Sequence, residues 1–103
     1  MTNLIKQLRE IGLKQNESEI YLFLLQNGIS TPPQIARGTN IARTNCYNIL
    51  NALRKKDVID EHSKGKRKAY IARSSTTLRL NLERKLESLN KLLPDLEALH
   101  ITQ

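Results

Sequence analysis

The chain has 103 residues, of which 17 are Lys or Arg and 10 are Asp or Glu, and its formal net charge is +7. This length supports one ordinary domain, and 39% hydrophobic residues are enough for a folded core, which excludes a disordered tail. One Cys excludes an internal disulfide, no Cys/His group has metal-ligand spacing, and no apolar run suits a signal peptide or a membrane span, so we expect a cytoplasmic protein without metal or cofactor.

The first third of the chain predicts two helices. Apolar residues at helical spacing cover residues 3–11, and Gly12 ends that helix. Asn16 and Glu19 then form a capping-box pattern, with Asn16 as the N-cap. The helix that follows is apolar nearly all round over residues 20–26, which predicts burial in the middle of the domain.

A second start signal opens the next helix. Thr31 is a favoured N-cap, Pro32 suits the first helical position, and Gln34 completes a capping box. The Gly-Thr-Asn sequence at 38–40 breaks this helix, and a third helix runs from about residue 42 to 56. Two short helices joined by a tight turn predict a helix-turn-helix.

The third helix has one apolar and one polar face. Residues at i, i+3, i+4 and i+7 make the apolar face: Cys46, Ile49, Leu50 and Leu53. The opposite face presents Thr44, Asn48, Asn51 and Lys55, and its flanks carry Arg43, Asn45 and Tyr47. We expect the apolar face to join the core and the polar face to be available for a ligand.

Two short segments after this helix predict a β-hairpin. Residues 58–62 and 67–72 are the expected strands, and the turn at 63–66 contains Gly65. Its tip is basic, with Lys64, Lys66, Arg67 and Lys68. A basic hairpin directly after a recognition helix is a wing. The sequence therefore predicts a mainly α fold with a small β-hairpin wing, a winged helix-turn-helix domain over residues 1–73.

The C-terminal segment, residues 74–103, predicts one long helix. Its leucines alternate at spacings of four and three, as in a coiled-coil seam: Leu82, Leu86, Leu89, Leu93 and Leu96. Pro94 should kink or restart this helix. Because the seam exceeds what a small core needs, we favour a homodimer joined through it. The alternative is that the helix folds back onto the first helix of its own chain.

The positive charge is concentrated in the middle of the chain. Residues 1–30 hold three basic and three acidic side chains, and residues 74–103 hold four of each. Residues 31–73 hold ten basic and three acidic side chains and so carry the whole excess. Such a concentration over a recognition helix and a wing attracts a polyanion, whereas a solvated basic face without a partner is the plainer alternative.

Taken together, these stretches resemble a known family. Over about residues 4–73 the chain resembles the winged-helix DNA-binding domain of TrmB-like transcriptional regulators. The stretches that carry the resemblance are, in order, GLKQNESEIYLFLLQNG, PPQIARGTNIARTNCYNILNALRKKDVID and KGKRKAYIA. Asn40, Ala42 and Asp57 depart from the Gly, Pro and Gly that the family usually has there. Full-length relatives continue into a sugar-binding domain, and the chain ends at Gln103 before one, so we expect no small-molecule effector.

The expected ligand is double-stranded DNA, read by side chains on the recognition helix. Asn pairs bidentately with adenine and Arg with guanine, which favours base contacts by Arg43, Thr44, Asn45 and Asn48. We expect phosphate contacts, which give affinity rather than specificity, from Tyr47 and from Thr31, Gln34 and Arg37 of the preceding helix. Asn51 and Lys55 are expected to contact phosphates as well, or else to be solvated helix positions. The wing residues are expected along the neighbouring DNA backbone or minor groove: Lys64, Lys66, Arg67 and Lys68.

Several of these residues have structural alternatives. Arg43 could pair with Glu17 or Glu19 instead of DNA, and Tyr47 could be a packing residue with its hydroxyl at the phosphate edge. Cys46 lies on the apolar face, so core packing is favoured over redox sensing. His62 and His100 have no partners at metal-ligand spacing and are expected at the surface.

These patterns favour a sequence-specific transcriptional regulator, a repressor that binds a palindromic operator as a homodimer in the cytoplasm, associated with the nucleoid. Two other functions are compatible with the fold: a winged-helix protein-interaction module in a larger assembly, and a sequence-independent chromatin or nucleoid protein. An enzyme is not expected, because the sequence has no Gly-rich phosphate loop, nucleophile elbow or His-carboxylate motif.

Overall fold

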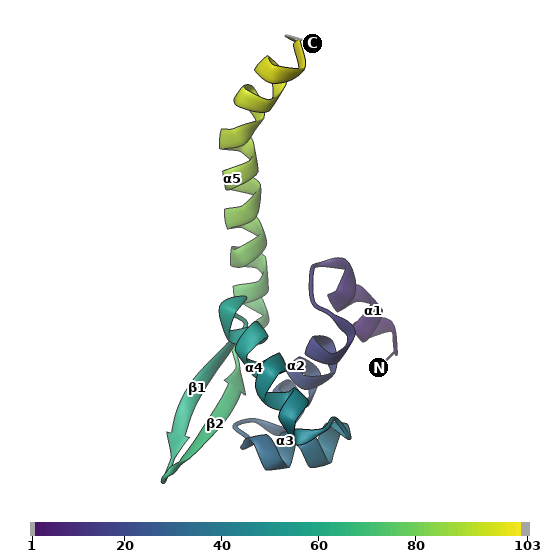
Figure 1. Ribbon diagram of the computed structural model, residues 1–103, viewed down its shortest axis with the longest axis vertical. Helices are drawn as coiled ribbons and strands as arrows, with labels where there is room; N and C mark the ends of the chain where they lie inside the picture. Colours follow the sequence, from purple (N-terminus) through teal and green to yellow (C-terminus); the bar gives the residue numbers. More distant parts are fainter. Residues whose placement is uncertain (1, 102–103) are drawn as a thin grey trace. The chain divides into compact units, whose positions relative to one another are not determined.

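The computed structural model describes residues 2–101, together with the side chains of all of these except Thr2, Lys64 and Ile101. Five helices and one hairpin follow one another along the chain (Figure 1): α1 Thr2–Glu10, α2 Gln15–Asn27, α3 Pro32–Thr39, α4 Arg43–Lys55, β1 Ile59–Lys64, β2 Arg67–Ala72 and α5 Ser75–Ile101. The chain divides into two compact units, Met1–Arg73 and Ser74–Gln103. The predicted mainly α fold with a two-stranded wing and a long C-terminal helix is confirmed.

The core of the first unit forms around α2. This helix contacts α1, α3, α4 and β2, and its residues Ile20, Tyr21 and Leu24 are at most 1% exposed. The other core side chains come from the segments just before α2 and β1 and from α3, α4 and the hairpin: Leu13, Ile35, Cys46, Leu50, Leu53, Val58, Ile59, Ala69 and Tyr70. Burial of each large apolar side chain contributes about 1.5–3 kcal/mol. One side of α2 stays at the surface, where Leu25 is 47% exposed, so its burial is less complete than its apolar sequence predicted.

The start of α2 differs from the prediction. Lys14, not Asn16, is the N-cap, and the backbone N–H of Lys14 donates a hydrogen bond to Oε1 of Glu17 at 2.8 Å. Ser18 supports the same turn by donating from its hydroxyl to the Lys14 carbonyl at 2.9 Å. Glu17 takes the capping role from Glu19 because its carboxylate is buried and also meets a cation at the end of α4.

That cation belongs to Lys56, the residue at the C-terminal cap of α4. Its ammonium nitrogen donates to Oε1 of Glu17 at 2.5 Å and to the carbonyl of Gly12 at 3.0 Å. The pair thus ties the end of the recognition helix to the turn between α1 and α2. It also removes the alternative in which Arg43 pairs with an acid of α2, because among the described residues Arg43 forms no ion pair with Glu17 or Glu19.

We expect Lys56→Met to lower the free energy of unfolding by about 1–3 kcal/mol, because it leaves the Glu17 carboxylate buried with one hydrogen bond fewer. The Lys56 side chain is 35% exposed, which keeps the effect below that of breaking a fully buried pair. Urea denaturation measures it. Lys55→Met is the control, because the neighbouring ammonium is exposed and forms no ion pair among the described residues. Equal midpoints for the two variants would show that the pair contributes nothing.

The turn between α3 and α4 keeps the predicted geometry. Thr31 is the N-cap of α3, and its backbone N–H donates to Oε1 of Gln34 at 2.9 Å, which confirms the capping box. Asn40 adopts the left-handed conformation with φ 60° and ψ 27°. Asp57, after α4, has φ 60° as well. Asn and Asp tolerate this conformation better than other non-glycine residues, so both helices end normally without the family's usual Gly.

The wing is a tighter hairpin than predicted. Its strands are antiparallel with Lys64 opposite Arg67, so Gly65 and Lys66 form a two-residue turn and β1 extends further than expected. Gly65 has φ 66°, the positive value that a type II′ turn requires at its first central residue. Tyr70 exchanges backbone hydrogen bonds with Ser30, at 2.9 and 2.8 Å. This bridge, which no sequence pattern predicted, fixes the hairpin to the segment before α3.

The second unit is the single helix α5, which spans 27 residues. It continues through Pro94, so the helix does not restart there, although the ribbon changes direction in its last turns (Figure 1). Its seam leucines lie in solvent with exposed fractions from 37% to 58%: Leu82, Leu86, Leu89, Leu93 and Leu96. Neither α5 nor any other helix within residues 2–101 is long and apolar enough to cross a membrane.

Candidate nucleic-acid interface

The recognition helix α4 presents the predicted polar face to solvent. Thr44, Asn48, Asn51 and Lys55 are all exposed, as are the flanking Arg43, Asn45 and Tyr47. The opposite side is anchored by Cys46, Leu50 and Leu53, which are completely buried. Tyr47 is 43% exposed, so it combines partial packing with an accessible ring. The helix is therefore held rigidly by one face while the other offers amide, hydroxyl and ammonium groups.

One flank of α4 borders a hollow of about 240 Å³ that joins three elements. Its lining comes from the start of α3, from α4 and from the wing: Thr31, Pro32, Pro33, Arg43, Tyr47, Arg67 and Lys68. Five of these residues were predicted to contact DNA, and they are far apart in the sequence. Three are cationic, so the hollow suits a phosphate group.

The residues at the start of α3 differ in how accessible they are. The Thr31 side chain is 6% exposed, which leaves it little surface for a phosphate and makes it chiefly a capping residue. Gln34 uses its amide oxygen in the capping box, but it is exposed and its amide nitrogen can still donate. Arg37 is exposed on the same helix. The predicted contribution of α3 thus rests on Gln34 and Arg37 more than on Thr31.

The structure separates the basic residues of the middle segment into paired and unpaired ones. Arg54 and Lys68 lie near Glu61, at 3.4 and 3.8 Å, Lys56 pairs with Glu17, and Arg73 lies 3.5 Å from Asp60. Among the described side chains, the basic residues of this segment without an ion pair are Arg37, Arg43, Lys55, Lys66 and Arg67. The side chain of Lys64 lies outside the described residues. The unneutralised charge therefore falls on α3, α4 and the hairpin tip.

The other flank of α4 borders a second hollow, which no sequence pattern indicated. Its volume is about 350 Å³, and it lies between the start of α2 and the middle of α4: Lys14, Gln15, Asn16, Glu17, Asn48, Ile49 and Ala52. Asn48 thus stands between the core side of the helix and its outer face. Only the packing of α2 against α4 brings Lys14 to this flank, so no local pattern could have indicated it.

The sequence model of the sugar-specific transcriptional regulator TrmB matches residues 8–75, which is more than half of the chain. The chain belongs to the TrmB family. The resemblance inferred from the three sequence stretches is thereby confirmed, and the matched region contains α2, α3, α4 and the wing, the elements that form the surface described above. This family consists of transcriptional regulators.

Several solved structures share the fold of this chain. TrmBL2, described as an archaeal chromatin protein with a novel mode of DNA binding, superposes with a TM-score of 0.85 and 19% identity over 96% of this chain. The chain spans only 38% of TrmBL2. No curated protein matches the sequence.

Two smaller neighbours are similar over most of their own length. MepR from Staphylococcus aureus, solved in complex with DNA, has a TM-score of 0.59 and 18% identity over 91% of this chain and 86% of its own. Mb0332 from Mycobacterium bovis, described as a homodimeric winged helix-turn-helix DNA-binding domain, has a TM-score of 0.58 and 22% identity over 88% and 86%. At these identities the likeness establishes the winged-helix fold.

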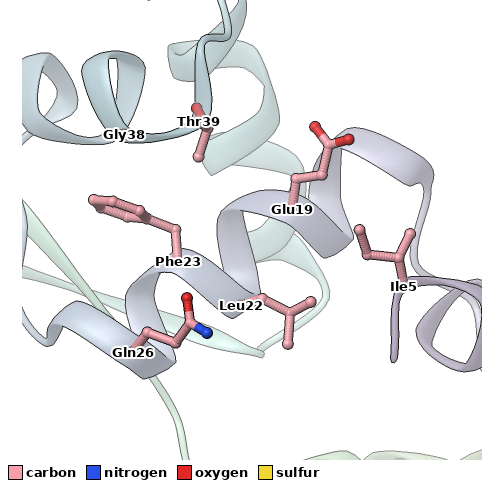
Figure 2. A pocket seen from close by; sticks show the side chains of 7 residues that line it. All are labelled: Ile5, Glu19, Leu22, Phe23, Gln26, Gly38 and Thr39. Carbon is pink, nitrogen blue, oxygen red and sulfur yellow. The ribbon is translucent and has the colours of Figure 1, made fainter. Parts of the chain in front are cut away.

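A third hollow in this TrmB-family domain lies away from the basic surface. It has a volume of about 240 Å³ and is lined by residues of α1, α2 and α3 (Figure 2): Ile5, Glu19, Leu22, Phe23, Gln26, Gly38 and Thr39. The ring of Phe23 lies against Gly38, where a Cβ atom would be 2.1 Å from it, so glycine permits this packing. Among these described lining residues Glu19 alone is charged, and its negative charge makes the hollow unsuitable for phosphate.

The remaining reactive side chains have structural positions. Cys46 is completely buried, its thiol lies 3.6 Å from the carbonyl oxygen of Ile41, and burial raises the pKa of the thiol. A thiol of this kind resists oxidation, which agrees with core packing rather than redox sensing. His62 and His100 are exposed, as predicted. Within residues 2–101 no group of three or more His, Cys, Asp or Glu side chains could hold a metal ion.

Proposed function

We propose that this chain is a sequence-specific double-stranded DNA-binding transcriptional regulator. The observation that carries the proposal is the outer face of α4, whose exposed polar side chains lie beside cations that form no ion pair among the described residues. Glu17 pairs with Lys56 and Asp60 with Arg73, whereas Glu61 lies 3.8 Å from Lys68. The family of the chain supports the regulatory role.

Base recognition is assigned to the N-terminal half of α4. The major groove accepts an α-helix, and Asn or Arg side chains there form paired hydrogen bonds with adenine or guanine. Asn48 and Thr44 point outward from the buried stripe, and Arg43 and Asn45 flank them at the helix start. These four residues are the proposed base contacts. Recognition helices characteristically place their N-terminal residues at the base edges, which agrees with this half of the helix.

Phosphate contacts are assigned to the surfaces on both sides of these residues. The hollow beside the wing, with Arg43, Tyr47, Arg67 and Lys68 in its lining, is the proposed seat of one phosphate. Lys66, at the turn of the hairpin, is assigned to a phosphate of the neighbouring DNA backbone. We assign a phosphate contact to Lys64 as well. Asn51 and Lys55 lie further along α4 and are assigned to phosphates. Gln34 and Arg37 on α3 are assigned to phosphates of the same DNA strand. These contacts supply affinity and register but no sequence information.

The regulator is proposed to act as a homodimer joined through α5. The seam leucines are between 37% and 58% exposed, and a stripe of that length is rarely left in water. Pro94 precedes Leu96 by two positions and thus faces away from the seam, where its missing N–H does not disturb the packing of a partner helix. A two-fold dimer places its recognition helices on a palindromic operator, with half-sites about 10 bp or a multiple apart.

A dimer bound across a promoter blocks access to it without any further partner, so we propose repression as the mode of action. The proposed site of repression is the nucleoid in the cytoplasm. The mechanism requires no metal or cofactor and no small molecule, since occupancy of the operator alone is sufficient.

Replacing Lys66 and Arg67 by Ala tests the wing. We expect weaker binding to every duplex and a salt slope, log K against log salt concentration, that is shallower by about 2 per protomer, because about 0.9 counterions are released per phosphate contact. Lys6→Ala combined with Arg9→Ala is the control, since it removes the same charge from α1. A salt slope that changes equally in both double variants would show that Lys66 and Arg67 of the wing do not contact phosphates.

A second candidate function is sequence-independent binding of duplex DNA. It is favoured by the similarity to TrmBL2, which is described as an archaeal chromatin protein. The same basic surface would serve both functions. Competition separates them, because a specific site binds about 10³–10⁷ times more tightly than random duplex, whereas a chromatin protein shows a ratio near one.

A further inference from the structure

Glu61 places a carboxylate at the junction between the wing and the recognition helix. Its Oε1 lies 3.2 Å from the Tyr70 hydroxyl, 3.4 Å from Nη1 of Arg54 and 3.8 Å from Nζ of Lys68. The three partners come from β2 and α4, and Glu61 itself stands on β1. One acid therefore meets two cations beside a surface whose other cations, Arg43 and Arg67, have no acidic partner among the described residues.

The position of this carboxylate is set from inside the protein. Tyr70 is 3% exposed and directly opposite Glu61 in the hairpin, and its backbone is fixed by the bridge to Ser30. A buried tyrosine hydroxyl needs a hydrogen-bond partner, which here is the Glu61 carboxylate. The cations are freer, since the side chains of Arg54 and Lys68 are 45% and 70% exposed. Glu61 is thus the fixed member of the cluster, and the two cations are held by it.

Cations that lie next to an acid contribute to DNA binding differently from cations without an acidic partner. A free Lys or Arg follows a phosphate in any register of the protein on the duplex, and so adds to sequence-independent affinity. A cation kept next to Glu61 is partly neutralised. It contacts a phosphate only when the DNA backbone passes through that position. Base contacts on α4 fix this register in a specific complex but not in a non-specific one.

From this cluster we propose that Glu61 is a specificity-determining residue: by holding Arg54 and Lys68, it suppresses sequence-independent DNA binding more than binding to the specific site. The inference rests on the proposed DNA-binding function. Lys68 is the member of the cluster that also lines the phosphate hollow, so it links the acid to the interface directly.

The test compares Glu61→Gln with Asp60→Asn on a random 20-bp duplex. Both variants remove one negative charge from β1, but neighbouring residues of a strand point to opposite faces, and Asp60 pairs with Arg73 instead. The amide oxygen that Glu61→Gln introduces still accepts the Tyr70 hydrogen bond, and thermal denaturation of each variant measures whether the fold is retained. Binding is followed from low to physiological salt, and the second duplex is the preferred site obtained by selecting bound duplexes from a random DNA pool.

For Glu61→Gln we expect random-duplex affinity to rise at least about threefold beyond Asp60→Asn, with a salt slope steeper by about 1–2, because up to two cations are released to phosphates. The ratio of operator to random affinity falls. Adding Lys68→Gln to Glu61→Gln should remove about half of the gained slope, which ties the effect to the cluster.

Three results would overturn the inference. Equal affinities and slopes for Glu61→Gln and Asp60→Asn would show an effect of net charge alone. Weaker binding of both duplexes by Glu61→Gln would show that the acid only holds the wing in place. A wild-type chain that binds neither duplex would overturn the proposed DNA-binding function together with this inference, so that failure is distinguishable from the other two.

Discussion

Replacing Leu86 and Leu89 by Lys is expected to convert the proposed dimer into monomers and to abolish binding to a duplex with two half-sites at concentrations where the wild-type chain saturates it. Both leucines lie in solvent in the single chain, with exposed fractions of 58% and 44%, so the substitutions leave the winged-helix unit intact. In a dimer, four leucines are lost from the seam, each contributing about 1.5–3 kcal/mol, and four ammonium groups take their place.

Sedimentation equilibrium measures the change in association state directly. Ser88→Lys combined with Glu87→Gln is a control matched in net charge, because it adds one positive charge and removes one negative charge at positions of α5 outside the leucine seam. The control should remain dimeric. A Leu86→Lys and Leu89→Lys variant that also remains dimeric would exclude the C-terminal seam as the interface, while leaving the DNA-binding surface of the first unit untouched.

Asn48→Ala is expected to weaken binding to the preferred operator by about 1–3 kcal/mol and to relax the choice of base at one position of each half-site, because a bidentate contact with a base edge is lost. Binding to random duplex should change little. The side chain is exposed, so the free energy of unfolding should stay within about 0.5 kcal/mol of that of the wild type.

Equilibrium binding to operator and random duplexes measures both effects. Asn51→Ala is the comparison, because it removes the same amide one turn further along α4, at a position assigned to phosphate. It should weaken binding to the two duplexes by similar factors. If Asn48→Ala also weakens both equally, Asn48 contacts the backbone and the base contacts must be sought among Arg43, Thr44 and Asn45.

Much of the fold could be predicted because its signals are local. The capping box of Thr31 and Gln34, the left-handed Asn40 and the apolar stripe from Cys46 to Leu53 each depend on residues within a few positions of one another. The helix-turn-helix and its exposed polar face follow from these patterns alone. The same is true of the hairpin, although its turn is two residues shorter than the pattern indicated.

What the sequence did not reveal depends on contacts between distant residues. Lys56 and Glu17 are 39 positions apart, and the same Glu17 carboxylate caps α2 at Lys14 rather than at the predicted Asn16. The bridge between Ser30 and Tyr70 and the cluster around Glu61 arise only when the hairpin packs beside α3 and α4. The distribution of charge along the sequence located the basic segment, but ion pairing decides which cations remain available, and that requires the packed structure.

Selection of bound duplexes from a random DNA pool tests whether this surface reads a specific sequence. We expect enrichment of a short motif that occurs twice in inverted orientation, with centres separated by about 10 bp or a multiple of it, as two recognition helices of a dimer require. A bound pool that stays random in sequence, or a protein that retains no duplex at all, would contradict sequence-specific regulation by this surface.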